Sequence, residues 1–267
     1  VMRFSAQAAA GYRLPGAPSW QAQLAAQLGR DADLEGQAEG DLARWMAERK
    51  LQLSQQQSET QLSYTAQVQP AQLDDLLRVY AARQMRSHLS AATLTSVIQQ
   101  LARQSARRPD SVNDRMAKEM SRLRYGDLPQ DAFPDTAALR DLDTPAGLQT
   151  LRQQWQRLSQ QPVTYFLSGP MDAASARSLA ERYLAGIPRR AADGAPSVLS
   201  QQPGYRVSRL EIGIEPQGSV RAMGSQPMHW TPDSAMRTAI LSRIIYRKLR
   251  HELREKEAGI YRLNFNV

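Results

Sequence analysis

The stretch "TPAGLQTLRQQWQRLSQQPVTYFLSGPMDAASARSLAERYLAGIP", residues 144–188, contains a helix, a strand and a second helix in succession. Apolar residues recur at helical spacing in its first part, and Pro145 favours a helix start because its fixed φ suits the first helical position. The run 162–170 is rich in aromatic and β-branched residues and predicts a buried strand. Asp172 is a suitable N-cap for the helix expected at 173–185. A strand is therefore expected between two helices in this stretch.

Three further strands are expected upstream of this stretch. "VMRFSAQ" (1–7) alternates apolar and polar residues, which predicts a half-buried strand. The segments 51–57 and 60–68 read as a polar hairpin, with the short connection Ser58–Glu59 between them. Further helices are expected from Pro70 onward and over about 90–107.

A short amphipathic helix, "SWQAQLAAQLGRD" (19–31), follows the first strand. Its apolar stripe is Trp20, Leu24 and Leu28, and Gly29 is expected to end it. Gln23 and Gln27 are four residues apart and therefore share one face.

Composition excludes several classes of site. The 267-residue chain contains no cysteine, so disulfides, thiolate zinc sites and a cysteine nucleophile are excluded. Its net charge of +8 permits an anionic partner, but the arginines are mixed with acids, as in "RHELREKE" (250–257). No basic run is interleaved with aromatic residues, which argues against a nucleic-acid-binding module. No apolar run is long enough to cross a membrane.

The part after 189 has a different composition. Ala, Gly, Pro and Ser dominate 189–204, which predicts a linker. Strands are expected at 205–214, 219–225 and 260–267. Between them lies a long helix with Thr231 as its N-cap. Its expected core stripe consists of Met236, Ile240, Ile244, Leu249 and Leu253.

Histidines do not form an evident metal site. His88, His229 and His251 are far apart in the sequence. "HELRE" (251–255) begins like the zinc helix H-E-x-x-H, but Glu255 stands at its last position. One histidine on a charge-rich helix favours a surface position over a metal site.

Two stretches carry a family resemblance. The strand "TYFLSG", the turn "GPMD" and the phrase "AERYLAGIP" resemble a signature of the pitrilysin, or insulinase-type, zinc peptidases. "LREKEAGIYRLNFNV" (253–267) is similar to a second motif of that family, in which an arginine and a tyrosine are seven residues apart, as Arg254 and Tyr261 are here. The order of the expected elements makes the resemblance extend over essentially the whole chain.

The resemblance implies α+β modules, each with a mostly antiparallel sheet backed by helices. An active module carries H-x-x-E-H, in which two histidines bind zinc and the glutamate activates water. Here Gln23 and Gln27 stand in place of the histidines and Ala26 in place of the glutamate. A neutral amide is a poor zinc ligand, and alanine is no base. The resemblance therefore implies a degenerate metal site, with no catalytic residue and no metal in this chain.

The implied organisation is one near-complete module followed by the start of a second. We expect an inactive peptidase-like module at 1–193, a linker at 194–204, and the first portion of the last module at 205–267. By resemblance, Arg254 and Tyr261 bind the peptide substrate, since a guanidinium and a phenol can both donate to a carbonyl oxygen. Zinc is expected in the catalytic half, on the same chain or on a partner subunit.

Three functions stay open at this point. The chain is expected to be the non-catalytic half of a long bacterial zinc protease, which encloses and positions peptides. The alternatives are a structural or assembly protein of the same fold and, with less support, a basic nucleic-acid-binding module. A periplasmic location is an expectation at the level of the family, because the sequence contains no visible signal.

Overall fold

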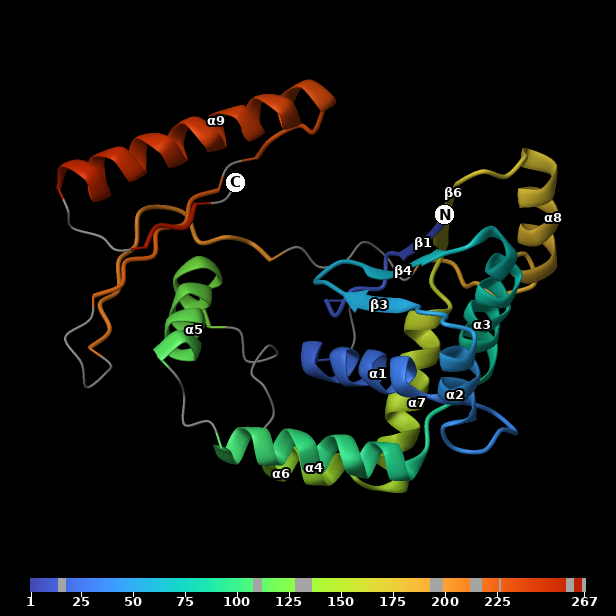
Figure 1. The fold of residues 1–267 in the computed structure, drawn as a ribbon. Helices are drawn as coiled ribbons and strands as arrows, with labels where there is room; N and C mark the ends of the chain where they lie inside the picture. Colours follow the sequence, from blue (N-terminus) through green and yellow to red (C-terminus); the bar gives the residue numbers. More distant parts are fainter. Residues whose placement is uncertain are drawn as a thin grey trace. The chain divides into compact units, whose positions relative to one another are not determined.

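The computed structural model describes residues 1–13, 18–107, 112–127, 136–192, 199–211, 218–225, 227–257 and 262–265. It divides into two compact units, Val1–Ile212 and Gly213–Val267. Figure 1 shows the elements of both. The domain boundaries expected from the sequence, with a linker at 194–204, stay a prediction.

The first unit contains most of the regular structure. Its strands are β1 (Met2–Ala8), β2 (Asp33–Leu34), β3 (Ser54–Gln57), β4 (Leu62–Val68), β5 (Ser87–His88) and β6 (Val163–Ser168). Its helices are α1 (Ser19–Asp31), α2 (Asp41–Glu48), η1 (Pro70–Gln72), α3 (Leu73–Arg86), α4 (Ala91–Arg107), α5 (Val112–Tyr125), α6 (Thr136–Leu142), α7 (Pro145–Ser159) and α8 (Ala173–Tyr183). This mixture confirms the expected α+β class.

The main sheet has four strands in the order β3-β4-β1-β6, and each pairing is antiparallel. The N-terminal strand β1 lies inside the sheet, where Phe4 faces Ala66 of β4 on one side and Leu167 of β6 on the other. The strands β3 and β4 form the expected hairpin. The chain thus places its first strand inside the sheet, between β4 and the much later strand β6 at the edge.

One face of this sheet is buried against helices. Alternate residues of β1 and β4 point into the core, and Met2 and Leu62 are almost fully buried. Tyr80 of α3 packs edge-on against Phe4, with ring centroids 5.1 Å apart, and against Tyr64 at 5.2 Å. The predicted period-2 alternation of β1 is confirmed.

Helix α1 packs on α7 through a close approach at Gly29. A Cβ at this position would collide with the indole ring of Trp155. The prediction that Gly29 ends the helix is wrong, because α1 continues to Asp31. This glycine serves packing, since only a residue without a side chain lets the ring lie on the helix backbone.

Strand β6 is half-exposed, so the prediction of a fully buried strand is wrong. It lies at an edge of the sheet, and its residues alternate between partly buried and exposed, with Phe166 54% exposed. Sequence alone does not distinguish the two cases, because an apolar run fits a buried strand and an edge strand alike.

Arg189 joins the segment after α8 to the core. Its guanidinium donates to the hydroxyls of Tyr165 and Tyr80, to the amide oxygen of Gln84, and to the carbonyl of Ser159. These partners belong to β6, α3 and the end of α7. One side chain therefore connects the sheet to two helices beside it.

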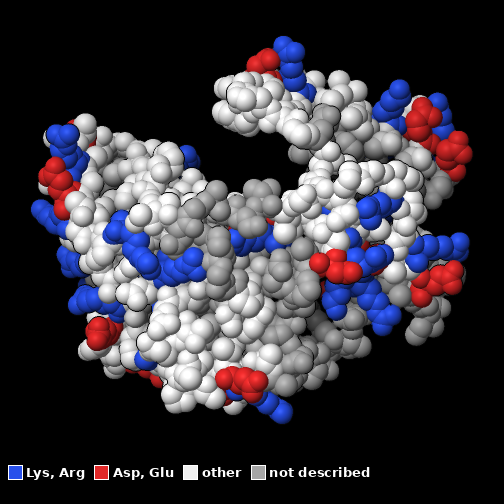
Figure 2. Space-filling model, turned by 180° about the vertical axis from the view of Figure 1, so that it is seen from behind, with Lys and Arg blue, Asp and Glu red and all other residues white. Residues whose placement is uncertain are grey.

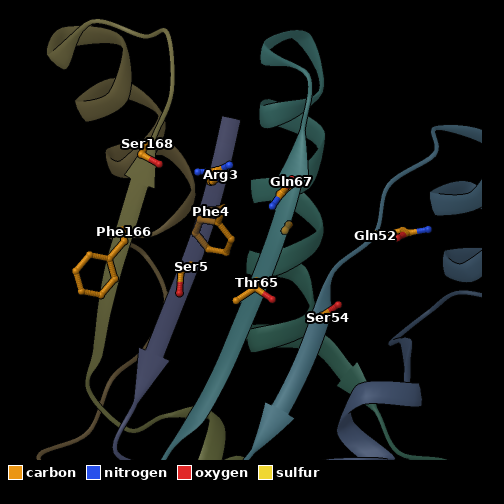
Figure 3. A pocket seen from close by; sticks show the side chains of 10 residues that line it. Arg3, Phe4, Ser5, Gln52, Ser54, Thr65, Gln67, Phe166 and Ser168 are labelled. Carbon is orange, nitrogen blue, oxygen red and sulfur yellow. The ribbon is translucent and has the colours of Figure 1, made fainter. Parts of the chain in front are cut away.

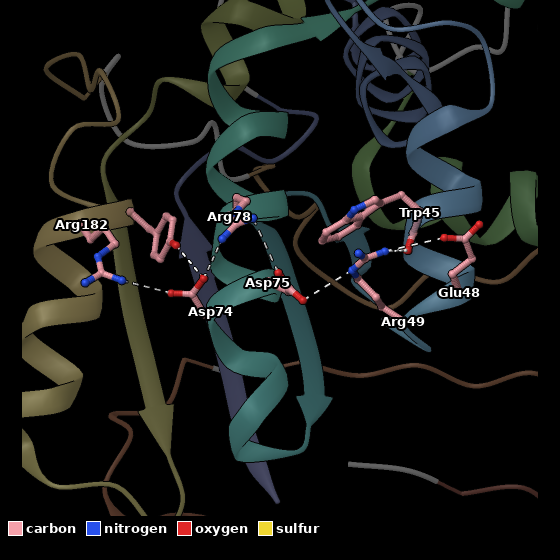
Figure 4. A network of polar contacts seen from close by, with 8 residues as sticks. Trp45, Glu48, Arg49, Asp74, Asp75, Arg78 and Arg182 are labelled. Carbon is pink, nitrogen blue, oxygen red and sulfur yellow. Dashed lines mark hydrogen bonds and ion pairs between the residues drawn. The ribbon is translucent and has the colours of Figure 1, made fainter.

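A second polar network lies on the surface of α2, α3 and α8 (Figure 4). Asp74 accepts from Tyr183 at 2.7 Å and pairs with Arg78 at 3.0 Å. Asp75 pairs with Arg49, whose guanidinium lies 4.1 Å from the centre of the Trp45 ring. Because these groups are half-exposed, each pair contributes little by itself, and the network mainly fixes the relative positions of the three helices.

The second unit is built on one long helix, α9 (Pro232–Arg250), followed by the π-helical turn η3 (His251–Lys256). Thr231 and Ser234 form a reciprocal capping box, which confirms Thr231 as the N-cap. Pro232 occupies the first turn, where its missing N–H costs nothing.

Two expectations for the second part of the chain are wrong. No strand is assigned to the described residues 205–211, 218–225 and 262–265. The expected core stripe of α9 is also uncovered, with Met236, Ile240 and Ile244 more than half-exposed. The missing strands and the exposed stripe have one cause. A two-stranded hairpin is marginal by itself, and the described residues of the second unit form no sheet against which α9 could bury its apolar side.

Candidate functional site

The degenerate metal positions all lie on α1. Gln23 is exposed, Gln27 is half-buried, and Ala26 is buried in the core at 3% exposure. The helix forms as expected, so both glutamines lie one turn apart on the same side. Their role as relics of a metal site stays a prediction.

The surroundings of Ala26 do not fit a zinc ion. The amide nitrogen of Gln55, on β3, donates to the Ala26 carbonyl at 2.8 Å and ties the helix to the sheet at this place. The methyl group of Ala26 provides no ligand and no base. Across the described residues, no three His, Asp or Glu side chains come together as a metal-binding group.

The second face of the main sheet is a distinct surface. Its side chains come from alternate positions of all four strands and are exposed or half-exposed. They are Arg3, Ser5, Gln7, Ser54, Gln56, Ser63, Thr65, Gln67, Thr164, Phe166 and Ser168. We call this set the open sheet face. It carries hydroxyls and amides throughout, and Arg3 is the one charged residue of its four strands.

The open sheet face is hollowed in the half that contains Arg3 and Ser168, as Figure 3 shows. The hollow has a volume of about 540 Å³, and Arg3, Thr65 and Phe166 are among its lining residues. The row Ser54, Thr65, Ser5 and Phe166 crosses the sheet by direct strand pairing. Such a surface offers donors and acceptors with little net charge, beside one aromatic ring.

Arg254 lies in the second unit, within η3, and is exposed. Gln23, Ala26 and Gln27 belong to the first unit. Tyr261 lies outside the described residues. The substrate-binding roles expected for Arg254 and Tyr261 stay predictions.

The "HELRE" segment forms ion pairs within its own helical turn. Nδ1 of His251 lies 2.8 Å from Oε2 of Glu255, and Arg250 lies 3.9 Å from the other carboxylate oxygen. The hydrogen bond with His251 lowers the pKa of Glu255. These exposed side chains bind one another.

Charged side chains are dispersed over the surface. On the face shown in Figure 2, Lys and Arg are separated by uncharged areas, and several lie beside Asp or Glu. Arg78, Arg122 and Arg237, for example, each pair with a carboxylate on their own helix. No helix within the described part of the chain is both long and apolar enough to span a membrane.

Sequence reasoning missed the open sheet face. The signal was present, because β1 and β4 alternate in polarity and β3 is polar throughout, with hydroxyl or amide side chains at the outward positions apart from Arg3. The face appears only once β6 is paired with β1, since that pairing brings Phe166 and Ser168 beside Ser5 and Arg3. Strand alternation is visible in a sequence, whereas pairing between distant strands is not.

The four-stranded antiparallel sheet and the helices that cover one of its faces are consistent with a module of the pitrilysin type. The chain has the fold of the pitrilysin-type (M16) peptidases. The resemblance found in the sequence was to long bacterial zinc proteases of the PqqL type. No protein-family model matches the chain, and no curated protein matches it.

Solved structures provide the comparison. A mutant of the ferredoxin protease FusC, in complex with Arabidopsis ferredoxin, is 29% identical, with a TM-score of 0.82. The periplasmic protease PqqL from Escherichia coli is 16% identical, with a TM-score of 0.76. Each match covers 98% of this chain and 29% of the protease. This chain thus spans less than a third of the length of either protease.

A third match is to the inactive domain of a peptidase of this family from Pseudomonas fluorescens. It is 15% identical, has a TM-score of 0.59, and covers 74% of this chain and 48% of that domain. At this identity the match concerns the fold alone. The fold therefore occurs both in proteases and in a domain described as inactive.

Proposed function

We propose that this chain is a non-catalytic part of a pitrilysin-type zinc protease and that it helps to enclose and position peptide substrates. The observation that carries the proposal is on α1, where Gln23, Ala26 and Gln27 have the spacing of the zinc-protease signature and, by resemblance, stand in its place. The methyl side chain of Ala26 is buried and can neither bind a metal nor activate water. The backbone carbonyl of Ala26 already accepts a hydrogen bond from the Gln55 side chain. The similarity to FusC over 98% of the chain supports a protease context.

Under this proposal the catalytic zinc belongs to another part of the protease, on the same polypeptide or on a partner subunit. The substrates are peptides or small proteins; ferredoxin is the protein bound in the FusC structure. A periplasmic location is part of the proposal, by analogy with PqqL.

Metal analysis and a peptidase assay test whether the chain lacks zinc and peptidase activity. The isolated 267-residue chain is expected to contain no stoichiometric zinc and to cleave no peptide. Stoichiometric zinc together with hydrolysis that is lost on chelation would overturn the proposal. The double variant Gln23→His and Gln27→His is measured in the same two assays. It supplies two imidazoles, while Ala26 still provides no general base.

We further propose that the open sheet face is a wall of the substrate chamber. It presents hydrogen-bonding groups without carboxylates, so that it accommodates peptides of varied sequence. In the full-length protein, Thr65→Arg is expected to raise KM for peptide substrates, because a long cation fills the hollow. Ala43→Arg, on the exposed side of α2, is the matched control and should change KM little. Equal KM values for both variants would count against this wall.

A further inference from the structure

The turn η3 contains a set of charged side chains that the proposed function leaves unexplained. All six residues from His251 to Lys256 are π-helical, and the N–H of Glu257 donates to the carbonyl of Glu252 at 3.1 Å. A π-helical turn is rare and is frequently found at functional sites. Arg254 lies inside this turn.

Both carboxylates of η3 are already engaged by other side chains. Oε2 of Glu255 is bound by His251 at 2.8 Å, and its Oε1 lies 3.9 Å from Nε of Arg250. The carboxylate of Glu252 is bound by Lys256 at 2.9 and 3.1 Å. Among the described residues, no hydrogen bond or ion pair joins the guanidinium of Arg254 to an acceptor.

The end of α1 provides an example of an adjacent arginine and carboxylate that bind each other. There Arg30 binds Asp31, the next residue, with two hydrogen bonds of 2.9 and 3.1 Å. Arg254 and Glu255 have the same sequential relation. The difference is that Glu255 is held by His251, four residues earlier.

We infer that His251 is a positioning residue: by holding Glu255, it keeps the Arg254 guanidinium free to bind an oxygen acceptor of a bound peptide. The acceptor is a backbone carbonyl or a carboxylate, both of which suit the guanidinium fork. This inference rests on the proposed peptide-binding role of Arg254. It gives the "HELRE" segment a role in peptide binding that needs no metal.

The test measures peptide affinity in the full-length protein by titration calorimetry. The probe is an acetylated and amidated peptide of alanine and glutamine, and a second peptide has one glutamate in place of a glutamine. Arg254→Ala is expected to weaken binding about tenfold, as for the loss of a charge-assisted hydrogen bond. A larger loss for the glutamate peptide identifies a carboxylate as the acceptor, and equal losses identify a carbonyl.

The variants of His251 separate positioning from folding. His251→Ala frees Glu255 to pair with Arg254 and should weaken binding about two- to fivefold, the range of an exposed ion pair. Adding Glu255→Gln to His251→Ala removes the competing carboxylate and should restore the affinity. A purely structural defect would not be restored by a second substitution in the same turn.

Lys256→Ala is the matched control. It frees the carboxylate of Glu252, which is two residues before Arg254 and faces another side of the helix, so affinity should stay unchanged. If Arg254→Ala has no effect on binding, the proposed role of Arg254 fails, and the positioning role fails with it. If Arg254→Ala weakens binding but His251→Ala does not, or if the double variant is not restored, only the positioning role is overturned.

Discussion

Helices α7 and α9 carry similar apolar stripes, but the stripe of α7 is buried and that of α9 is exposed. In the first unit, Leu151 and Leu158 of α7 are fully buried. In the second unit, Ile240 and Ile244 of α9 are more than half-exposed. Both helices begin in the same way, with a Thr–Pro pair whose threonine accepts from a backbone N–H of the first turn. The ends of a helix are thus set locally, whereas burial of its stripe depends on a partner surface.

The two units therefore differ in what stabilises them. The first has a continuous core between its sheet and its helices. Within the described residues of the second, no large hydrophobic side chain is fully buried. Substitutions matched in chemistry should separate these two situations.

The largest effect is expected from leucine truncation. Leu76→Ala on α3 removes a fully buried side chain and should lower the free energy of unfolding by about 2 to 5 kcal/mol. Leu241→Ala on α9, where the side chain is 54% exposed, should change it by less than about 0.5 kcal/mol. Urea unfolding followed by circular dichroism measures both. Equal losses would mean that Leu241 is covered in solution.

The next effect concerns alkaline pH. Burial raises the pKa of Tyr64 from 10.0 to about 12, with Gln84 and Arg189 partly opposing the shift. The folded chain therefore keeps this proton between pH 10 and 12 while the unfolded chain loses it, so stability should fall as pH rises through this window. The loss is up to about 3 kcal/mol.

Tyr64→Phe removes one titrating group and should make this part of the profile of unfolding free energy against pH less steep. Burial also raises the pKa of Tyr80, so a remaining slope is expected from Tyr80. The same substitution at Tyr246, on α9, controls for the loss of a phenolic hydroxyl outside the first core. If the alkaline profile of the Tyr64→Phe variant matched that of the unsubstituted chain, the assignment to Tyr64 would be wrong.

A smaller effect is expected at the contact between α1 and α7. Gly29→Ala places a methyl group against the Trp155 ring, and this strain outweighs the better helix propensity of alanine. The expected net loss is about 1 to 2 kcal/mol in the urea titration. Gly224→Ala in the second unit meets no atom within 4 Å and should leave stability unchanged.

The smallest effect distinguishes the two Thr–Pro starts. Thr144→Ala should lower the stability of the first unit by about 1 kcal/mol, because the N–H of Gly147 loses its acceptor. Thr231→Ala should instead lower the helix content of α9 without shifting the main unfolding transition. Serine at either position keeps the hydroxyl and should restore the original behaviour.

The elements that sequence predicts well here are those decided by near neighbours. The caps at Asp172 and Thr231 form as expected, each with a side-chain oxygen that accepts a backbone N–H, and Pro145 stands in the first turn of α7 as predicted. The alternation of β1 and the β3–β4 hairpin are confirmed as well. In each case the information lies within a few residues.

The elements that sequence misjudges depend on distant contacts. Gly29 is a packing residue because Trp155 lies on it, more than a hundred residues further along the chain. The exposure of Phe166 follows from the edge position of β6, and the exposure of Ile240 from the lack of a covering sheet. Of the candidate site, sequence supplied Gln23, Ala26, Gln27 and Arg254, but neither the open sheet face nor the pairing of His251 with Glu255.

The central place of β1 has a consequence for synthesis on the ribosome. Ala8 pairs with Val163, so one side of β1 stays without its partner until the chain has been made well past α7. At about 5 to 20 residues per second, the interval between the completion of β4 and the arrival of β6 is roughly 5 to 20 s. During this time the nascent chain exposes an unpaired strand edge of low charge, so folding yield should depend on translation speed and on chaperones that shield such edges.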